Sequence, residues 1–148
     1  MIDRQLLPLV LMDANDEQPI EGRTRLQKMV FLMQQEFAER DEPLPGEYQY
    51  IPYDYGPFAK KLYDDIDDLS DRHVIDEDPE TIEDGKVKYY YRLGRRGDDF
   101  LHEWPDSDVK RVRKVAERIK RDFNDMPLPQ LLDHVYTQYP EYAENSVL

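Results

Sequence analysis

The sequence predicts a mostly helical α+β protein: a winged helix-turn-helix core with a two-stranded wing and two appended C-terminal helices. Three observations support this. Apolar residues recur at helical spacing in separate stretches, two strand-like segments flank an acidic turn, and two amphipathic stretches follow the second strand. We assign residues 1–104 to a winged-helix domain and residues 105–148 to a C-terminal helical extension packed on the same core.

Three helices are expected before the wing. Leu6–Leu11 predicts a short first helix, followed by a loop rich in turn-forming residues. The apolar positions between Arg23 and Arg40 follow helical spacing and predict a second helix. Gly56 then breaks the chain, and we place Pro57 in the first turn of the third helix, because its missing N–H would have no partner there anyway.

The wing is expected to begin at Val74. A polar hairpin loop fills residues 76–85, and the segment 86–93 (KVKYYYRL) returns as the second strand. Residues 94–104 predict one further short helix. The tyrosines at 89–91 alternate across the strand, so that one face is at least partly exposed, which makes Tyr90 a candidate interface residue.

Two helices are expected after the wing. Asp106 or Ser107 is a suitable cap for a long helix, because a side-chain oxygen there accepts from a free backbone N–H. The segment MPLP then breaks the chain before a last helix. The long helix has an apolar stripe formed by Val109, Val112, Val115, Ala116, Ile119 and Phe123.

The composition is strongly acidic. Thirty-three acids face twenty bases, so the formal net charge is −13. Such a charge raises self-repulsion unless salt screens it, and the Debye length falls to about 3 Å at 1 M salt. We interpret the chain as salt-adapted, or alternatively as an ordinary acidic domain. It has no cysteine, and its apolar runs are too short for a membrane span, so we expect a cytoplasmic protein without membrane contact or cofactor.

Two motifs carry a family resemblance. Residues 25–28 (RLQK) with the apolar residues after them, and residues 53–58 (YDYGPF), resemble the YwgA-like family of small prokaryotic proteins. They are also loosely similar to SocA-like antitoxin domains, and residues 91–101 resemble the exit from the wing in PadR- and MarR-type regulators. The resemblance covers most of the chain and implies a winged-helix regulator, a toxin-neutralising module or a DNA-associated module. It transfers no catalytic residue.

No catalytic or metal-binding residue is predicted. The three histidines lie far apart in sequence and form no metal-ligand spacing. The segment 84–86 (DGK), after the acids at 76–78, weakly resembles the acidic core of metal-dependent nucleases, in which carboxylates hold Mg²⁺. Because this segment is also a natural solvated wing tip, we keep a nuclease only as a remote alternative.

The helix that precedes the wing enters the major groove in winged-helix proteins that read DNA. Here it would run from about Pro57 to Arg72 with an acidic polar face, which repels phosphates unless salt screens it. Lys60 and Lys61 at its N-terminal end are the part able to approach a DNA backbone. The acids expected on its solvated face are Asp64, Asp65, Asp67, Asp68 and Asp71.

The bases gather later in the chain. Residues 86–121 carry twelve bases and six acids, whereas the rest of the chain carries a net charge of −19. Either the long helix packs beside the acidic helix and neutralises it, or it contacts nucleic acid or an acidic protein. The predicted nucleic-acid or partner-binding residues are Lys60, Lys61, Lys88, Tyr90, Arg92, Arg95, Arg96, Lys110, Arg111, Arg113, Lys114, Arg118 and Arg121.

Five tyrosines surround the Gly-Pro turn. They could stack bases or anchor a partner, but we interpret them mainly as residues that fasten a helix to the core. The leading hypothesis for function is a non-catalytic, DNA-associated or transcription-regulating protein that forms a homodimer. The alternative is a protein-interaction module, antitoxin-like or part of a complex. The tyrosines are Tyr48, Tyr50, Tyr53, Tyr55 and Tyr63.

Overall fold

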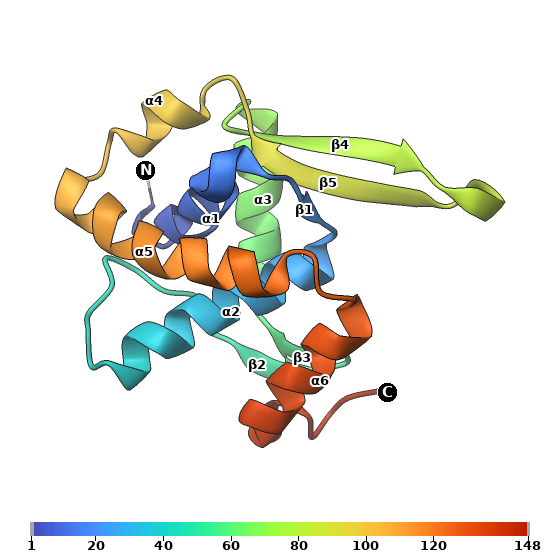
Figure 1. The fold of residues 1–148 in the computed structure, drawn as a ribbon. Helices are drawn as coiled ribbons and strands as arrows, with labels where there is room; N and C mark the ends of the chain where they lie inside the picture. Colours follow the sequence, from blue (N-terminus) through green and yellow to red (C-terminus); the bar gives the residue numbers. More distant parts are fainter. Residues whose placement is uncertain (1, 148) are drawn as a thin grey trace.

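The computed structural model describes residues 2–147, and these form six α-helices, five strands and three short 3₁₀ turns (Figure 1). The mostly helical α+β class predicted from the sequence is confirmed. The elements are α1 (Leu6–Glu17), β1 (Ile20–Glu21), α2 (Arg23–Glu39), β2 (Ile51–Tyr53), β3 (Gly56–Phe58), α3 (Lys60–Asp71), β4 (Ile75–Thr81), β5 (Val87–Leu93), α4 (Gly97–Leu101), α5 (Asp106–Phe123) and α6 (Leu128–Gln138).

Three of the strands form the sheet that carries the wing. Its order is β1-β5-β4, and both pairings are antiparallel. β1 pairs only with the base of β5, where Ile20 lies opposite Tyr91, while β4 and β5 stay paired out to Thr81 and Val87. The two longer strands therefore project from the body as a wing (Figure 1). The arrangement is compatible with the predicted winged-helix core.

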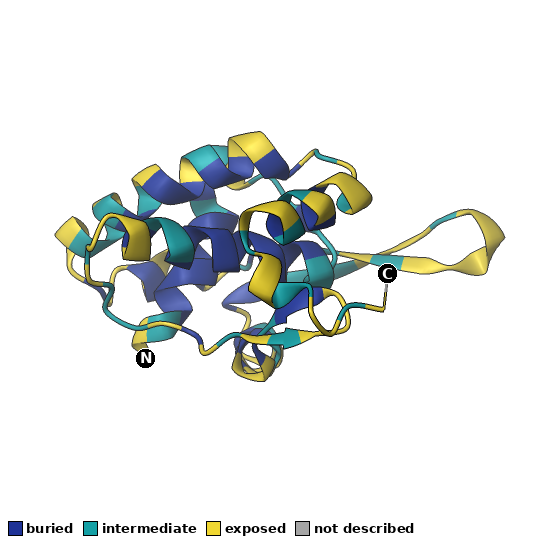
Figure 2. Ribbon diagram, turned by 90° about the horizontal axis from the view of Figure 1, so that it is seen from below, coloured by how far each residue is buried: buried dark blue, intermediate teal, exposed yellow. Residues whose placement is uncertain are grey.

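A single hydrophobic core holds the helices together. Apolar residues of α1, α2, α3, α5 and α6 belong to one buried cluster, and α5 packs against both α1 and α2. Figure 2 shows the inner helix faces buried and the outer part of the wing exposed. The division of the chain at residue 104 remains an interpretation of the sequence. Within residues 2–147, no helix is long and apolar enough to cross a membrane.

The wing is longer than the sequence suggested. Residues 76–81, predicted as loop, belong to β4, and only residues 82–86 connect it to β5. Propensity alone disfavours a strand with four acids and Pro79, but β4 is an edge strand, where proline and charge are tolerated. β1 was not predicted either, because two residues are too short to show an alternating pattern.

The third helix begins later than predicted. Pro57 lies in β3, opposite Pro52 of β2, and α3 starts only at Lys60. Neither proline has an N–H to donate, so the ladder depends on the neighbouring pairs. The expected cap of α5 was also wrong. Asp106 and Ser107 lie inside the helix, Pro105 occupies the cap position, and no side chain there makes a capping bond.

Two buried cations cover the ends of helices. Lys120 of α5 donates from Nζ to the carbonyl oxygens of Met12 (3.1 Å) and Ala14 (2.7 Å), where the regular helix of α1 ends. Arg25 of α2 donates to Phe123 O at 2.8 Å, at the C-terminus of α5. The last carbonyls of a helix have no partner within the helix and carry partial negative charge, so cations there join three helices.

Burial of two lysines makes stability depend on pH. Burial lowers the pKa of both Lys28 and Lys120 to about 8, whereas unfolded lysine titrates near 10.4. Between these values the unfolded chain binds more protons, so we predict that the free energy of unfolding rises by on the order of 2 kcal/mol from pH 8 to 9.5. Urea unfolding at several pH values measures it. Lys120→Met should reduce the slope and exposed Lys114→Met should not; equal slopes in all three proteins would contradict the assignment.

Candidate protein-binding surface

Polar side chains of the buried helix α2 hold the segment before α3 in place. Gln27 donates from Nε2 to Ala59 O (2.8 Å) and accepts from Ala59 N (3.2 Å). Gln34 makes the same pair of bonds with Tyr48, at 3.0 and 2.7 Å. Lys28 donates to Pro57 O at 3.1 Å. The RLQK motif thus fastens the β2–β3 hairpin to the core, because its side chains satisfy buried backbone groups.

The tyrosines around the hairpin divide into two kinds. Tyr48 is buried and donates from its hydroxyl to Asp65 Oδ2 at 2.7 Å, and Tyr50 donates to Gln27 O. Burial, with the charge of Asp65, raises the pKa of Tyr48 well above its usual value and keeps the hydroxyl a donor. These two confirm the fastening interpretation. Tyr53 and Tyr55, by contrast, are exposed.

Asp65 was expected on the solvated face of the helix, but it does not lie there. Its side chain is buried and receives two hydrogen bonds from Arg4, at 2.8 and 2.9 Å, as well as the one from Tyr48. The helical spacing places it between the apolar Leu62 and Ile66 stripe and the exposed acids, so a distant arginine can reach it. A paired carboxylate of this kind joins the N-terminus to α3.

A row of rings and one arginine runs from the hairpin to the wing, and we name it the aromatic row. Tyr53 stacks on Phe58 with ring centroids 5.0 Å apart, and Phe58 meets Tyr63 edge to face at 5.2 Å. The guanidinium of Arg23 lies 5.2 Å from the ring of Tyr63 and 5.7 Å from that of Tyr91. The row therefore joins β2, β3, α3, the start of α2 and β5 across one side of the molecule.

Arg23 also ties the base of the wing to α3 by hydrogen bonds. It donates to Tyr91 Oη (2.9 Å), Asp67 Oδ1 (2.6 Å) and Glu77 Oε2 (3.0 Å). Tyr91 donates in turn to Glu77 Oε2 at 2.5 Å. Because burial and this bond raise the pKa of Tyr91, its hydroxyl stays protonated. A shared network of this kind fixes the direction of the wing relative to α3.

A groove lies beside this network, between β5 and the start of α2, and we name it the wing groove. It encloses about 530 Å³ and is open to solvent. It shares Thr24 and Leu128 with an apolar hollow of about 460 Å³ below Tyr55. Val87 and Tyr89 on its wall are among the exposed apolar side chains. The groove is lined by Glu21, Gly22, Arg23, Thr24, Arg25, Glu77, Val87, Lys88, Tyr89, Tyr91 and Leu128.

The two elements that a winged-helix protein would present to DNA are both acidic here. α3 carries five acids and two bases, and residues 75–93 carry six acids and three bases. Asp64, Asp68 and Asp71 of α3 are exposed. At the N-terminal end of α3, Lys60 pairs with Asp64, and the other predicted base, Lys61, is exposed. This face repels a phosphate backbone and attracts a cationic surface.

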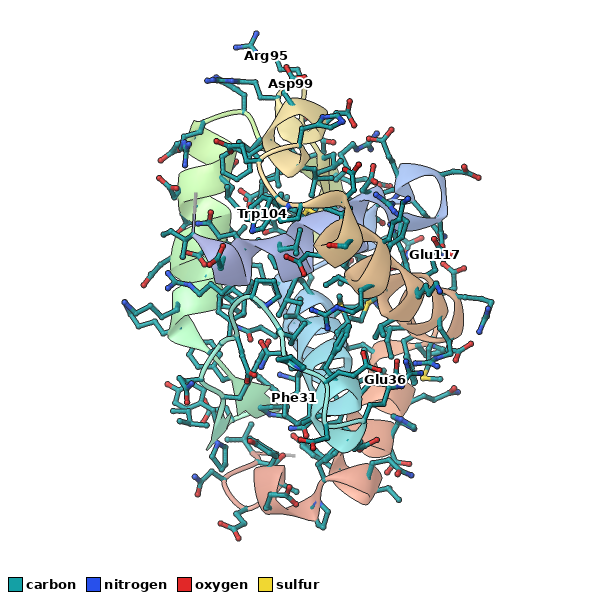
Figure 3. All side chains as sticks on the ribbon, turned by 90° about the vertical axis from the view of Figure 1, so that its left-hand side faces the viewer. Phe31, Glu36, Arg95, Asp99, Trp104 and Glu117 are labelled. Atoms are coloured by element: carbon teal, nitrogen blue, oxygen red, sulfur yellow. The ribbon has the colours of Figure 1, made fainter. Side chains whose placement is uncertain are left out.

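More arginines of α5 than predicted bind other parts of the same chain. Arg113 pairs with Asp13 of α1 at 2.6 Å, and Arg118 pairs with Glu36 of α2. Figure 3 shows Glu36 on the side of α2 that α5 covers. Arg111 donates to Pro43 O at 2.6 Å. Of the two alternatives for α5, packing beside the acidic helix is wrong: α5 packs on α1 and α2, and its arginines neutralise acids there.

The other predicted binding residues lie on separate parts of the molecule. On the wing, Lys88 pairs with Glu21 and Arg92 with Asp78, and half-buried Tyr90 lies opposite both acids. Arg95 projects at the α4 end, far from Phe31 (Figure 3). Arg121 of α5 pairs with its neighbour Asp122. No ion pair within residues 2–147 involves Lys61, Arg95, Arg96, Lys110 or Lys114, and all five are exposed.

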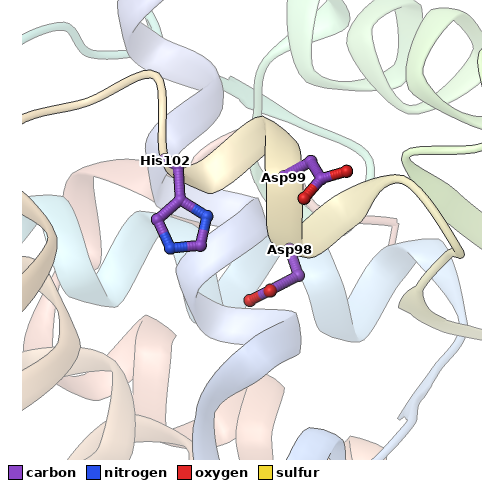
Figure 4. A group of neighbouring side chains, drawn as sticks. All are labelled: Asp98, Asp99 and His102. Atoms are coloured by element: carbon purple, nitrogen blue, oxygen red, sulfur yellow. The ribbon is translucent and has the colours of Figure 1, made fainter.

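Two clusters of acidic side chains are the places where a catalytic metal ion could be considered. Asp84 and Lys86 lie at the exposed wing tip, and the strand separates them from the acids at 76–78, which are at its base. At α4, Asp98 and Asp99 of the helix and His102 just after it place their ligand atoms within 4.8 Å of one another (Figure 4). All three are exposed, and acids in the first turn of a helix are stabilised by its dipole without any metal.

A comparison with protein families gives one match. The family model of the antitoxin SocA-like Panacea domain covers residues 26–145, which is most of the chain. The chain belongs to this family. No curated protein matches it. The SocA-like resemblance found in the sequence is therefore supported, whereas the YwgA-like and PadR/MarR resemblances remain predictions.

The SocA-like chain carries several site residues that sequence reasoning missed. Arg23 was seen only as a helix start, and Phe58 was named in the YDYGPF motif with no binding role. Tyr90 was chosen on β5, although Tyr89 and Tyr91 are the tyrosines that line the wing groove. One signal was available: alternation along a strand places 87, 89 and 91 on one face. Nothing in the sequence indicates that Arg23 reaches that face.

The placement of the α5 bases predicts two different responses to charge reversal. Changing Arg111, Arg113 and Arg118 together to Glu should lower the free energy of unfolding by about 1–3 kcal/mol at low salt, because each new acid meets an existing one. Partial recovery is expected in high KCl. Changing Lys110, Lys114 and Arg121 to Glu should cost less than about 0.5 kcal/mol. Melting temperature against KCl measures both, and equal losses would contradict the assigned pairs.

Proposed function

We propose that this SocA-like chain is a non-catalytic, antitoxin-like module that holds a protein partner on its acidic, aromatic side. The observation that carries the proposal is the aromatic row beside the wing groove, on the face formed by α3 and the wing. The family match supports a protein partner through the family's description as antitoxin-like. A cytoplasmic location and a homodimer remain part of the proposal.

The chemistry of this side suits a protein better than a nucleic acid. Tyrosine and arginine dominate the binding energy of many protein interfaces, because they combine large contact area with polar ends. Here Tyr53, Tyr55 and Tyr89 are exposed on elements that the core holds rigidly. The acids around them favour a partner surface rich in Lys and Arg and speed its approach. A toxin with a basic active surface has this character.

A second candidate is DNA association, and one observation favours it. Lys110 and Lys114 are exposed on α5 and form no ion pair with another described residue, and Arg121 is exposed and pairs with its neighbour Asp122. Three such bases are enough for weak, non-specific contact with a phosphate backbone. They lie on α5, away from the wing groove, so the two candidates predict binding through different elements.

The test is co-purification with the protein encoded beside this chain, at native salt and after nuclease treatment. We expect the partner to stay bound to the unchanged chain and to be lost when Asp64, Asp68 and Asp71 are all changed to Lys, because the acidic face is then reversed. The matched control is the Lys110, Lys114 and Arg121 to Glu variant, which should retain the partner. Circular dichroism melting is the check that both variants are folded.

Either of two binding results would contradict the proposal, and so would one growth result. Loss of the partner on nuclease treatment would show that nucleic acid holds the complex together. Loss in the α5 variant with full retention in the α3 variant would place the contact on the wrong side of the molecule. The same neighbour should also arrest growth when expressed alone and be neutralised by co-expression of this chain, and growth without arrest would argue against an antitoxin role.

A further inference from the structure

We propose that the wing groove binds a small phosphate ester, whose phosphate lies at the start of α2 and whose remaining part packs on the wall of the groove. The inference goes beyond the proposed function, because it names a small-molecule ligand and does not need the protein partner. Three features support it: unused backbone donors, a buried cation without a carboxylate, and a basic lining in an acidic chain.

The first turn of α2 leaves its backbone donors free. Gly22 N donates to Tyr89 O, and Gly22 O accepts from Leu26 N, which is the first bond of the helix. Among the described residues, the N–H groups of residues 23, 24 and 25 have no acceptor, no side chain caps the helix, and its first turn holds no acid. These groups form the positive end of a 17-residue helix, which is a favourable position for a phosphate.

The space in front of this helix start belongs to the wing groove. All the residues from Glu21 to Arg25 line it, and Thr24 adds a side-chain hydroxyl to the backbone donors. Gly22 has a φ of +82°, which turns the chain from β1 into α2, and a Cβ added there would meet no atom within 4 Å. A ligand can therefore reach the helix start without displacing protein atoms.

Arg25 supplies a charge that has no counter-charge. Its side chain lines the groove but is only 6% exposed, and burial lowers the pKa of its guanidinium. Nη1 donates to Phe123 O and Met126 O, whereas Nε is buried without a partner. No ion pair within residues 2–147 includes Arg25. A buried charge of this kind costs free energy, and an anion at the helix start would offset that cost.

The lining of the groove is basic, in contrast to the chain as a whole. Its bases are Arg23, Arg25 and Lys88, and its acids are Glu21 and Glu77. Both acids are already in ion pairs: Glu21 with Lys88 at 2.9 Å, and Glu77 with Arg23 at 3.0 Å. β5, which forms one wall, carries two bases and no acid. The charge of Arg25 is therefore left over, and it adds to the positive end of the helix.

The donors and the volume indicate the class of ligand. Three backbone N–H groups, a hydroxyl and a guanidinium suit the several oxygens of a phosphate better than the two of a carboxylate. The groove encloses about 530 Å³, which is within the range of small-molecule sites and more than a single ion fills. Its wall also holds Val87, Tyr89 and Leu128, where the group that carries the phosphate can pack and a flat ring can stack on the exposed tyrosine.

The test titrates the full chain with inorganic phosphate and with phenyl phosphate, at constant ionic strength, and follows N–H resonances by NMR. We expect saturable shifts at the backbone amides of residues 23–25 and at Arg25 Nε–H. Phenyl phosphate should bind about fivefold more tightly than inorganic phosphate, because its ring packs on Tyr89. Tyr89→Ser should remove this difference and leave the binding of inorganic phosphate unchanged.

A pair of matched variants separates the helix start from the net charge of the chain. Thr24→Glu places a carboxylate in the first turn of α2, where it stabilises the helix and excludes the anion. It should weaken the binding of both probes by about tenfold or more. Ser107→Glu makes the same change of charge at the same position of α5, whose start is exposed, and should bind both probes as the unchanged chain does.

Four results would overturn the inference. They are the absence of shifts at residues 23–25, undiminished binding by Thr24→Glu, an equal loss in Ser107→Glu, and phenyl phosphate that binds no more tightly than inorganic phosphate. None of these experiments uses the neighbouring protein. A negative result with partner binding intact would therefore reject the phosphate site alone, and loss of the partner experiment would leave the phosphate site standing.

Discussion

Two glutamine side chains of α2 hold in place the hairpin that carries part of the proposed binding surface. Gln27 and Gln34 each imitate a peptide group, donating to and accepting from the backbone of residues 59 and 48. Removing either would leave buried backbone groups without partners, at a cost of about 1–3 kcal/mol for each group. The hairpin lies between these two anchored residues. The positions of Tyr53 and Phe58, and hence of the aromatic row, therefore depend on the two glutamines.

The basic helix of this acidic protein has a physical explanation in the same terms. Lys120 satisfies the end of α1, and Arg113 and Arg118 neutralise acids of α1 and α2. When a helix packs on two others, its cations stabilise the contact if they reach the unpaired end carbonyls and the carboxylates of those helices. The charge therefore joins helices to one another, and the free positive surface is smaller than a count of lysines and arginines suggests.

Periodicity predicted most of the fold, because long amphipathic helices and β5 repeat their pattern over several turns or pairs. It failed where tertiary contacts decide the local structure. Pro57 is a good helix start by its own geometry, yet the pairing with Pro52 and the bond from Lys28 place it in a strand. At Gly56, φ is +91° and a Cβ would lie 2.9 Å from the Tyr136 ring, a contact 80 residues away that no local pattern reveals.

The site was less predictable than the fold. The acidic face of α3 was foreseen, apart from the burial of Asp65, but the exposure of Tyr53, Tyr55 and Tyr89 and the convergence on Arg23 were not. Arg23 meets Tyr63, Asp67, Glu77 and Tyr91 only because β1 delivers the start of α2 to the base of the wing. The role of a residue such as Arg23 can be predicted only when the order of the strands in the sheet is known.

Hydrogen exchange of the chain, alone and with the protein encoded beside it, tests the central claim most directly. If the partner sits on the acidic, aromatic side, exchange slows in the β2–β3 hairpin, along α3 and in β5, while the outer face of α5 is unchanged. Slower exchange confined to α5, with the wing and the hairpin as before, would contradict the account.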